Sequence, residues 1–199
     1  MSDLVDPPPG AAWQHVGPRT GFEVCWFALG GAGVVIDGTT AAVEDGAAWT
    51  VEYAIGLDRT WATEWARVRT RSVAGERTTE LAVVEPGRWT VDGRPAPQLD
   101  GCLDVDLEAS AMTNALPIHR LGFEVGAEAA APAAYVRVTP DAVERLEQVY
   151  VRRADRSGRR RYDYAAPAFG FACRLEYDRH GLILDYPGIA RRVAGADLL

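Results

Sequence analysis

Two acidic residues separated by one valine, Asp104 and Asp106, are the first candidates for chemistry. They lie in the segment CLDVDL, whose alternation predicts a strand with both acids on one face. Because a strand rises about 3.3 Å per residue, we expect their carboxyls about 7 Å apart, near the spacing in inverting glycosidases. We favour a second interpretation, in which these acids pair with nearby arginines such as Arg120. A raised pKa on one of the two acids would favour catalysis.

The segment MTNALPIHRLGF, residues 112–123, is the second candidate because it mixes apolar anchors with closely spaced polar groups. Pro117 prevents a long helix there. Two interpretations remain open. In one, the segment is a plug whose polar groups cap backbone ends. In the other, Asn114, His119 and Arg120 present hydrogen-bond donors to a ligand.

Several common chemistries lack the residues that they require. The glycines of residues 30–33 are followed by a strand and a turn, which indicates a hairpin and no phosphate-binding helix. The three cysteines are far apart, and the three histidines lack neighbouring ligands, so we expect neither a metal nor a cofactor. Six arginines surround Ser157 and Gly158, but a solvated hairpin tip in a protein of net charge −7 does not indicate nucleic-acid binding.

Short β-strands must position these candidates. The clearest is WTVEYAIGL, residues 49–57, with strict alternation, and a turn at Asp58 and Arg59 leads to the next strand at 61–73. Turn-forming residues bound further strands, which we expect at 80–84, 88–91, 102–107, 134–139, 148–152, 161–165, 169–178 and 182–186. Short helices are expected at 111–121 and 140–147.

The pattern predicts a mainly β protein. About ten strands without alternating helices favour one curled antiparallel sheet that forms an open or incomplete β-barrel. One or two short helices would plug its concave side. We expect residues 1–17, which include Pro7, Pro8 and Pro9, to form a flexible N-terminal leader, and 18–199 to form a single domain.

The expected location is the cytoplasm. The sequence begins without the basic and apolar regions of an export signal, and no apolar run is long enough for stable membrane insertion. Because no cysteine pair or ligand cluster suggests a permanent assembly, we expect a monomer or a weak dimer.

An ordered series of motifs resembles the "putative glycolipid-binding" family of bacterial proteins. The motifs are PGRWTVDG, LDGCLDVDLEASAMTNALPIHRLGF, EQVYVRR and DRHGLILDYPGIARRV. The resemblance implies an open β-barrel similar to those of the lipoprotein-carrier group, with lipid or glycolipid on the concave face. The family usually has Leu-Pro-Ile-Arg-Arg-Leu, so His119 replaces an arginine while Arg120 is retained. Ser110 stands where the family often has proline.

The leading hypothesis is therefore non-catalytic binding of a lipid or glycolipid, with polar side chains orienting the head group and apolar ones accepting the acyl part. The residues expected to contact it are Arg120, His119, Asn114, Asp104, Asp106, Trp89, Tyr150 and Tyr162. One alternative is a hydrolase acting on a sugar conjugate, with Asp104 and Asp106 as acid and base. A second is an interaction module whose core is filled by its own side chains.

Overall fold

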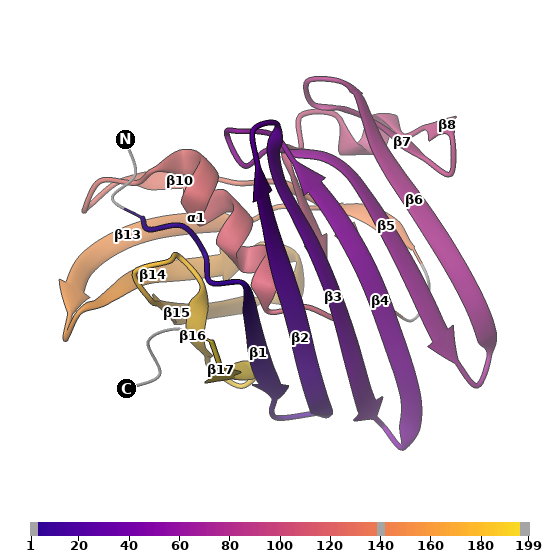
Figure 1. The fold of residues 1–199 in the computed structure, drawn as a ribbon, viewed down its shortest axis with the longest axis horizontal. Coiled ribbons are helices and arrows are strands. Elements are labelled where there is room, and N and C mark those ends of the chain that lie inside the picture. The colour runs from indigo at the N-terminus through magenta and orange to yellow at the C-terminus, as the bar shows by residue number, and fades with distance from the viewer. Residues whose placement is uncertain (1–3, 139–141, 196–199) are drawn as a thin grey trace.

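A sheet of 14 antiparallel strands dominates the computed structural model, which describes residues 4–138 and 142–195 (Figure 1). In spatial order the strands are β10 (Glu128–Ala130), β13 (Val149–Arg156), β14 (Arg159–Ala166), β15 (Phe171–Tyr177), β16 (Ile183–Tyr186), β17 (Ala190–Ala194), β1 (Gly10–His15), β2 (Arg19–Gly30), β3 (Gly33–Glu44), β4 (Ala47–Leu57), β5 (Thr63–Ser72), β6 (Gly75–Glu85), β7 (Arg88–Val91) and β8 (Arg94–Pro95). The sheet is not closed, because β10 and β8 are its end strands. The predicted open β-barrel is confirmed.

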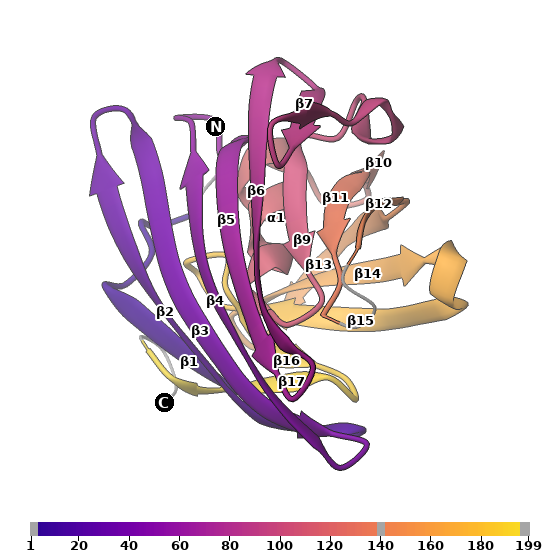
Figure 2. The same cartoon turned by 90° about the vertical axis from the view of Figure 1, so that its right-hand side faces the viewer.

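The sheet curls until its two halves face each other. In Figure 2, β1 to β6 form one wall and β13 to β15 form the other. Side chains alternate strictly along the long strands: on β3, Val34, Ile36 and Thr40 are buried while their neighbours are exposed. This period of two places one face of every long strand inside the barrel.

A short helix and a second sheet fill the concave side, between the two walls in Figure 2. The second sheet has the order β12 (Val143–Leu146), β11 (Ala133–Val136) and β9 (Asp104–Leu107), with β9 and β11 parallel. All residues of β9 and β11 are buried. The helix α1 (Ala115–Leu121) follows the 3₁₀ turn η2 (Met112–Asn114), which confirms the predicted helix at 111–121. No helix among the described residues is long and apolar enough to cross a membrane.

Two local predictions are wrong. Residues 140–147 were predicted to be helical, but 143–146 form β12, because β11 offers its edge for antiparallel pairing; residues 140 and 141 lie outside the described part. The predicted leader contains β1, which lies between β17 and β2 in the middle of the sheet. On β1, Trp13 is fully buried and donates a hydrogen bond of 2.8 Å to the Ile183 carbonyl. The prolines before it suggested flexibility, yet the alternation of buried Ala11, Trp13 and His15 is that of a strand.

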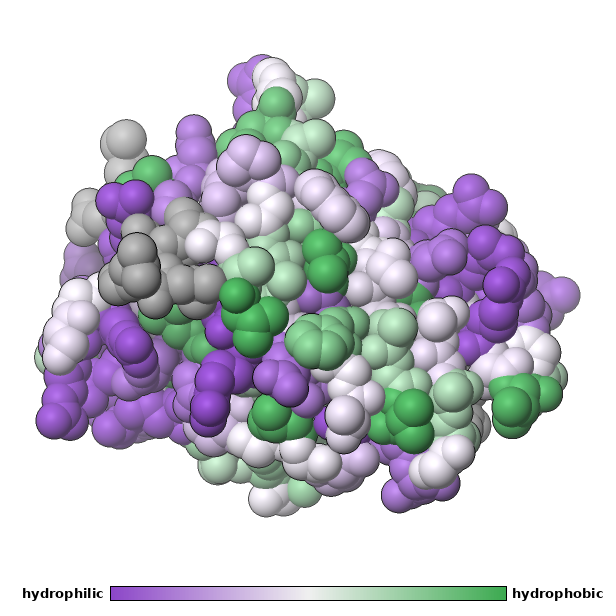
Figure 3. Space-filling model, turned by 60° about the horizontal axis from the view of Figure 1, so that its bottom comes forward, coloured by the Kyte–Doolittle hydropathy of each residue, from purple (hydrophilic) through white to green (hydrophobic). Residues whose placement is uncertain are grey.

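The outer surface of the sheet is mixed in polarity. In the view of Figure 3, hydrophobic residues are dispersed across the middle of the surface, and hydrophilic residues gather at both sides. On β2, Phe22 and Trp26 point outward and are each 55% exposed, while Glu23 between them points inward and is fully buried. The outer face therefore provides aromatic residues that can be replaced without touching the interior.

Candidate functional site

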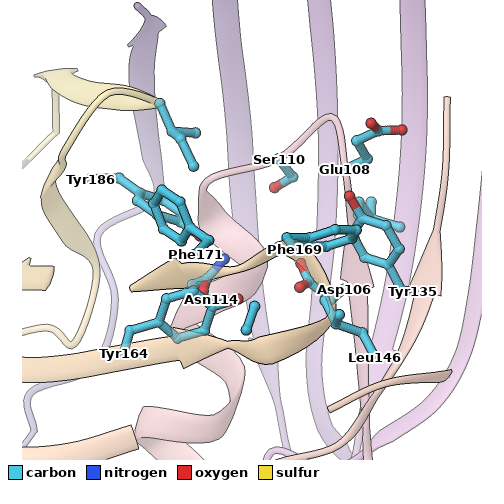
Figure 4. A pocket seen from close by; sticks show the side chains of 13 residues that line it. Asp106, Glu108, Ser110, Asn114, Tyr135, Leu146, Tyr164, Phe169, Phe171 and Tyr186 are labelled. Atoms are coloured by element: carbon cyan, nitrogen blue, oxygen red, sulfur yellow. The ribbon is translucent and has the colours of Figure 1, made fainter. Parts of the chain in front are cut away.

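A cavity of about 210 Å³ lies between the second sheet and the wall formed by β14 to β16 (Figure 4). Its walls are largely aromatic, and each ring comes from a different element. The rings belong to Tyr135 on β11, Tyr164 on β14, Phe169 in the 3₁₀ turn η3 (Pro167–Phe169), Phe171 on β15 and Tyr186 on β16. Polar residues from the β9 strand and the connection after it also line the cavity, namely Asp106, Glu108, Ser110 and Asn114. Aliphatic side chains complete the lining: Leu107, Leu146, Ala166 and Ile189.

The strand register explains why these rings meet. On β14, alternation turns Tyr164 inward, and the antiparallel pairing of Ala166 with Phe171 sets Phe171 on the same side. Gly170, with φ of +58°, allows the tight connection through η3. Ring centroids are 6.2 Å apart for Tyr164 and Phe171, and 6.0 Å apart for Tyr164 and Tyr186. The rings therefore support one another as a continuous wall.

Asp106 is the buried acid of the cavity. It receives hydrogen bonds from the Thr113 hydroxyl, at 2.8 Å, and from the Gln148 side-chain amide. Burial raises the pKa of Asp106 to about 6, against the lowering effect of these two hydrogen bonds. This carboxyl thus changes charge close to neutral pH.

Asp104 has a different environment, two residues earlier on the same strand. Arg120 of α1 binds it in bidentate fashion, with Nε to Oδ1 at 2.9 Å and Nη2 to Oδ2 at 2.6 Å. Asp104 is 2% exposed, and burial raises its pKa while Arg120 opposes the rise. The preferred interpretation, that both acids pair with arginines, is confirmed for Asp104 and wrong for Asp106, whose side-chain partners are Thr113 and Gln148. The pair fastens α1 to β9 and does not line the cavity.

The proposed acid–base pair has the raised pKa that catalysis would need, but its two carboxyls do not share a cavity. Both carboxyls have a raised pKa, whereas a raised pKa on one of the two was expected to favour catalysis. Only Asp106 lines the cavity, since Asp104 is occupied by Arg120. The two carboxyls do not face a common space in which a substrate could lie.

The other expected contact residues divide into lining and supporting groups. Asn114 lines the cavity, and its side-chain oxygen accepts a hydrogen bond of 2.9 Å from the Tyr150 hydroxyl. Tyr150 is fully buried behind the lining. Tyr162 packs edge-on against Tyr177. Trp89 of β7 donates a hydrogen bond of 2.9 Å to the Cys102 carbonyl. Neither Tyr162 nor Trp89 lines the cavity.

His119 of α1 packs against the connection that precedes β5. Its ring stacks on Trp61, with centroids 3.5 Å apart and an angle of 10° between the planes. Burial lowers the pKa of His119 to about 4. The side chain is therefore neutral at pH 7, and it does not line the cavity.

Glu23 is a buried acid that we did not predict. Its carboxylate accepts hydrogen bonds from the Tyr53 hydroxyl at 2.7 Å, from the Ser110 hydroxyl, and from the Ala111 backbone amide at 2.7 Å. Burial raises its pKa. Gly38 leaves room for the Tyr53 ring, since a Cβ there would lie 2.2 Å from Tyr53 Cζ. Glu23 thus fixes the turn that carries Ser110 into the cavity.

The sequence analysis also did not predict the aromatic lining of the cavity. Tyr162 of RYDYA was predicted to contact a ligand, but Tyr164 and the two rings of FGF at 169–171 were not. The available signal was the alternation on β14, which places Tyr162 and Tyr164 on one face. No group of three or more metal-ligating side chains occurs among the residues that the structure describes.

Comparisons with known proteins agree with the fold. The family described as "Putative glycolipid-binding" matches residues 10–192, which include β1. A DUF1089 family protein from Pseudomonas aeruginosa, known from a crystal structure, is 29% identical with a TM-score of 0.75, over 86% of this chain and 92% of that one. A β-barrel-like DUF1849 protein from Brucella abortus has a TM-score of 0.52 and 12% identity, over 95% of each chain, and so shares the fold alone. No curated protein matches the chain.

Proposed function

We propose, since the chain belongs to the "Putative glycolipid-binding" family, that it binds the head group of a lipid or glycolipid in this cavity without chemical turnover. The observation that carries the proposal is the meeting of five aromatic rings and several polar groups around one partly open pocket. Binding sites for small molecules are generally apolar cavities with a few convergent polar groups.

The size of the cavity favours a head group over a whole lipid. A cavity of about 150 Å³ can hold benzene. A space of about 210 Å³ therefore accommodates one ring-sized group. The acyl part would lie outside, along the cavity's more exposed ring, Phe169, which is 48% exposed. This changes our expectation that an apolar interior holds the acyl part.

The two alternatives differ in their support. An interaction module with a filled core predicts no space for a ligand, and the partly open pocket lined by aromatic rings supports binding over that alternative. A hydrolase remains a second candidate because the pKa of Asp106, raised to about 6, suits a general acid. Its intended partner Asp104 is bound to Arg120, so the geometry supports binding better than hydrolysis.

Titration of octyl glucoside into the full chain, followed by calorimetry, tests the proposal. Tyr164→Ala and Phe171→Ala should each weaken binding by about 1 kcal/mol, or roughly fivefold, because a stacking surface is lost. The matched control is Phe22→Ala on the outer face of β2, which should leave affinity unchanged. Equal affinities in all four proteins would refute the cavity as the binding site.

A separate assay tests the absence of turnover. Release of nitrophenol from nitrophenyl glycosides should not exceed the uncatalysed rate. A rate that disappears in Asp106→Asn would instead establish the hydrolase. Native mass spectrometry of protein purified from its own host would identify a co-purifying ligand.

A further inference from the structure

The strand β9 compensates one of its two buried acids and leaves the other without a counter-charge. Asp104 is paired with the guanidinium of Arg120 through two hydrogen bonds. In the part of the chain that the structure describes, the side-chain hydrogen bonds to Asp106 come from uncharged groups, Thr113 and Gln148. Asp106 is nonetheless only 7% exposed, and it lines the cavity. A buried carboxylate without a cation is costly.

The rest of the lining does not supply the missing charge. All 21 basic residues of the chain are arginines, yet the described residues that line the cavity include neither arginine nor histidine. Glu108, the second acid of the lining, accepts a hydrogen bond of 2.6 Å from the Val138 amide and lies 3.9 Å from Arg19. The charge of Glu108 is thus partly balanced from outside the cavity, and the lining itself is acidic.

Three of the rings opposite the acid pack against one another and form one side of the cavity. Tyr164, Phe171 and Tyr186 form a near-equilateral triangle, with centroids 6.2, 6.0 and 6.1 Å apart. Tyr135 and Phe169 form a second pair, 5.6 Å apart. Figure 4 shows the triangle and the pair on opposite sides, with Asp106 beside the pair. An ammonium group resting on the triangle would be attracted by the ring faces that it meets, because the faces carry partial negative charge.

We propose that the cavity recognises a cationic head group, a primary or quaternary ammonium, held between the Asp106 carboxylate and the rings of Tyr164, Phe171 and Tyr186. This inference rests on the proposed function, because it assumes that the ligand occupies this cavity. Aromatic faces attract cations within about 6 Å, and the attraction strengthens when water is excluded. The ligand's ammonium supplies the charge that Arg120 supplies to Asp104.

Charge separates this ligand class from other amphiphiles. A phosphate, sulfate or carboxylate would meet two acids and no basic lining residue. A neutral sugar could donate hydroxyl hydrogen bonds to Asp106 and stack on the rings, but it would gain neither the ion pair nor the cation–π attraction. The expected order of affinity is therefore cationic, then neutral, then anionic.

Three octyl amphiphiles that differ in the head group test this order on the wild-type protein. Octyl trimethylammonium, octyl glucoside and octyl sulfate would be titrated by calorimetry below their micelle concentrations. The cation should bind about tenfold more tightly than the glucoside, and the sulfate more weakly than both. Tetramethylammonium, which has no chain, should compete with the octyl cation.

Two acid-to-amide variants isolate the carboxylate. Asp106→Asn should weaken cation binding by about tenfold while changing glucoside binding by less than about twofold. Its amide can donate to the Thr113 oxygen, because that hydroxyl can turn to the Ser110 carbonyl at 3.4 Å. Asp37→Asn removes the same charge from an exposed position on β3 and should change neither affinity.

The outcomes separate this inference from the proposed function. If all three amphiphiles bind equally, and Tyr164→Ala weakens all three, the cavity binds ligands and its preference for cations is refuted. Tighter binding of the glucoside or the sulfate than of the cation also refutes the preference for cations. Binding that is insensitive to Tyr164→Ala overturns both proposals.

Discussion

Arg120→Leu separates a structural role of this arginine from a role as ligand anchor. The Arg120 side chain is 12% exposed and Asp104 is 2% exposed, and two hydrogen bonds of 2.9 and 2.6 Å join them. Leucine keeps much of the apolar contact of α1 but leaves the Asp104 carboxylate buried without its cation. Removing one partner of such a pair costs about 3 to 5 kcal/mol of unfolding free energy.

The expected loss is large enough to measure by thermal melting. For a chain of this length, each kcal/mol shifts Tm by about 2 to 4 °C, so Arg120→Leu should lower Tm by roughly 6 to 20 °C. Adding Asp104→Asn should recover most of the loss, because no uncompensated charge then remains. The matched control is Arg67→Leu, whose pair with Glu80 is 3.8 Å long and two-thirds exposed, and which should cost less than about 1 kcal/mol.

Ligand titration on the same variants completes the test. If Arg120→Leu melts within a few degrees of the wild type but loses amphiphile binding, Arg120 contacts ligand and our account of the pair is wrong. A low Tm that Asp104→Asn does not restore would also contradict it, because the loss would then come from packing.

Three further changes probe buried groups. Because the pKa of His119 is lowered from 6.5 to about 4, the wild type should lose stability as pH falls from 6.5 to 4. In urea unfolding, His119→Leu should lose up to about 3 kcal/mol less unfolding free energy over this range. Parallel pH profiles of the two proteins would contradict this. Because the pKa of Asp106 is raised from 3.8 to about 6, the wild type should lose about 3 kcal/mol of unfolding free energy as pH rises through that range. Asp106→Asn should therefore be more stable than the wild type at pH 8 but not at pH 3. Gly38→Ala should lower Tm because its Cβ would collide with Tyr53, whereas Gly31→Ala, with nothing within 4 Å, should not.

Local patterns in the sequence predicted the elements well where one face of a strand is buried. The alternation from Trp49 to Leu57 lies within β4, and the predicted strand at 88–91 coincides with β7. The pairing of Asp104 with Arg120 could also be predicted, because both lie close in sequence within one buried unit. Period and turn chemistry are local properties, which a single sequence contains.

The cavity could not be predicted in the same way. Its rings come from segments whose meeting depends on register, such as Ala166 opposite Phe171, and on the docking of β11 between the walls. Single residues in five elements carry no mark of that convergence. Likewise the helical prediction at 140–147 failed because the choice between helix and strand was made by a distant partner, β11.

The pairing of β1 with β17 makes the two walls one sheet. Ala12 lies opposite Ala194, and Trp13 reaches Ile183 across 170 positions of the sequence. Joining the walls therefore requires nearly the whole chain to have been synthesised, and such distant pairing slows folding. The end of β17 and the start of β1 lie next to each other, so a short linker from Ala194 to Gly10 turns this pairing into a local hairpin. A circularly permuted chain opened at the exposed turn between β5 and β6 then transfers the distant pairing from β1 and β17 to β5 and β6, and the two walls join through a local hairpin.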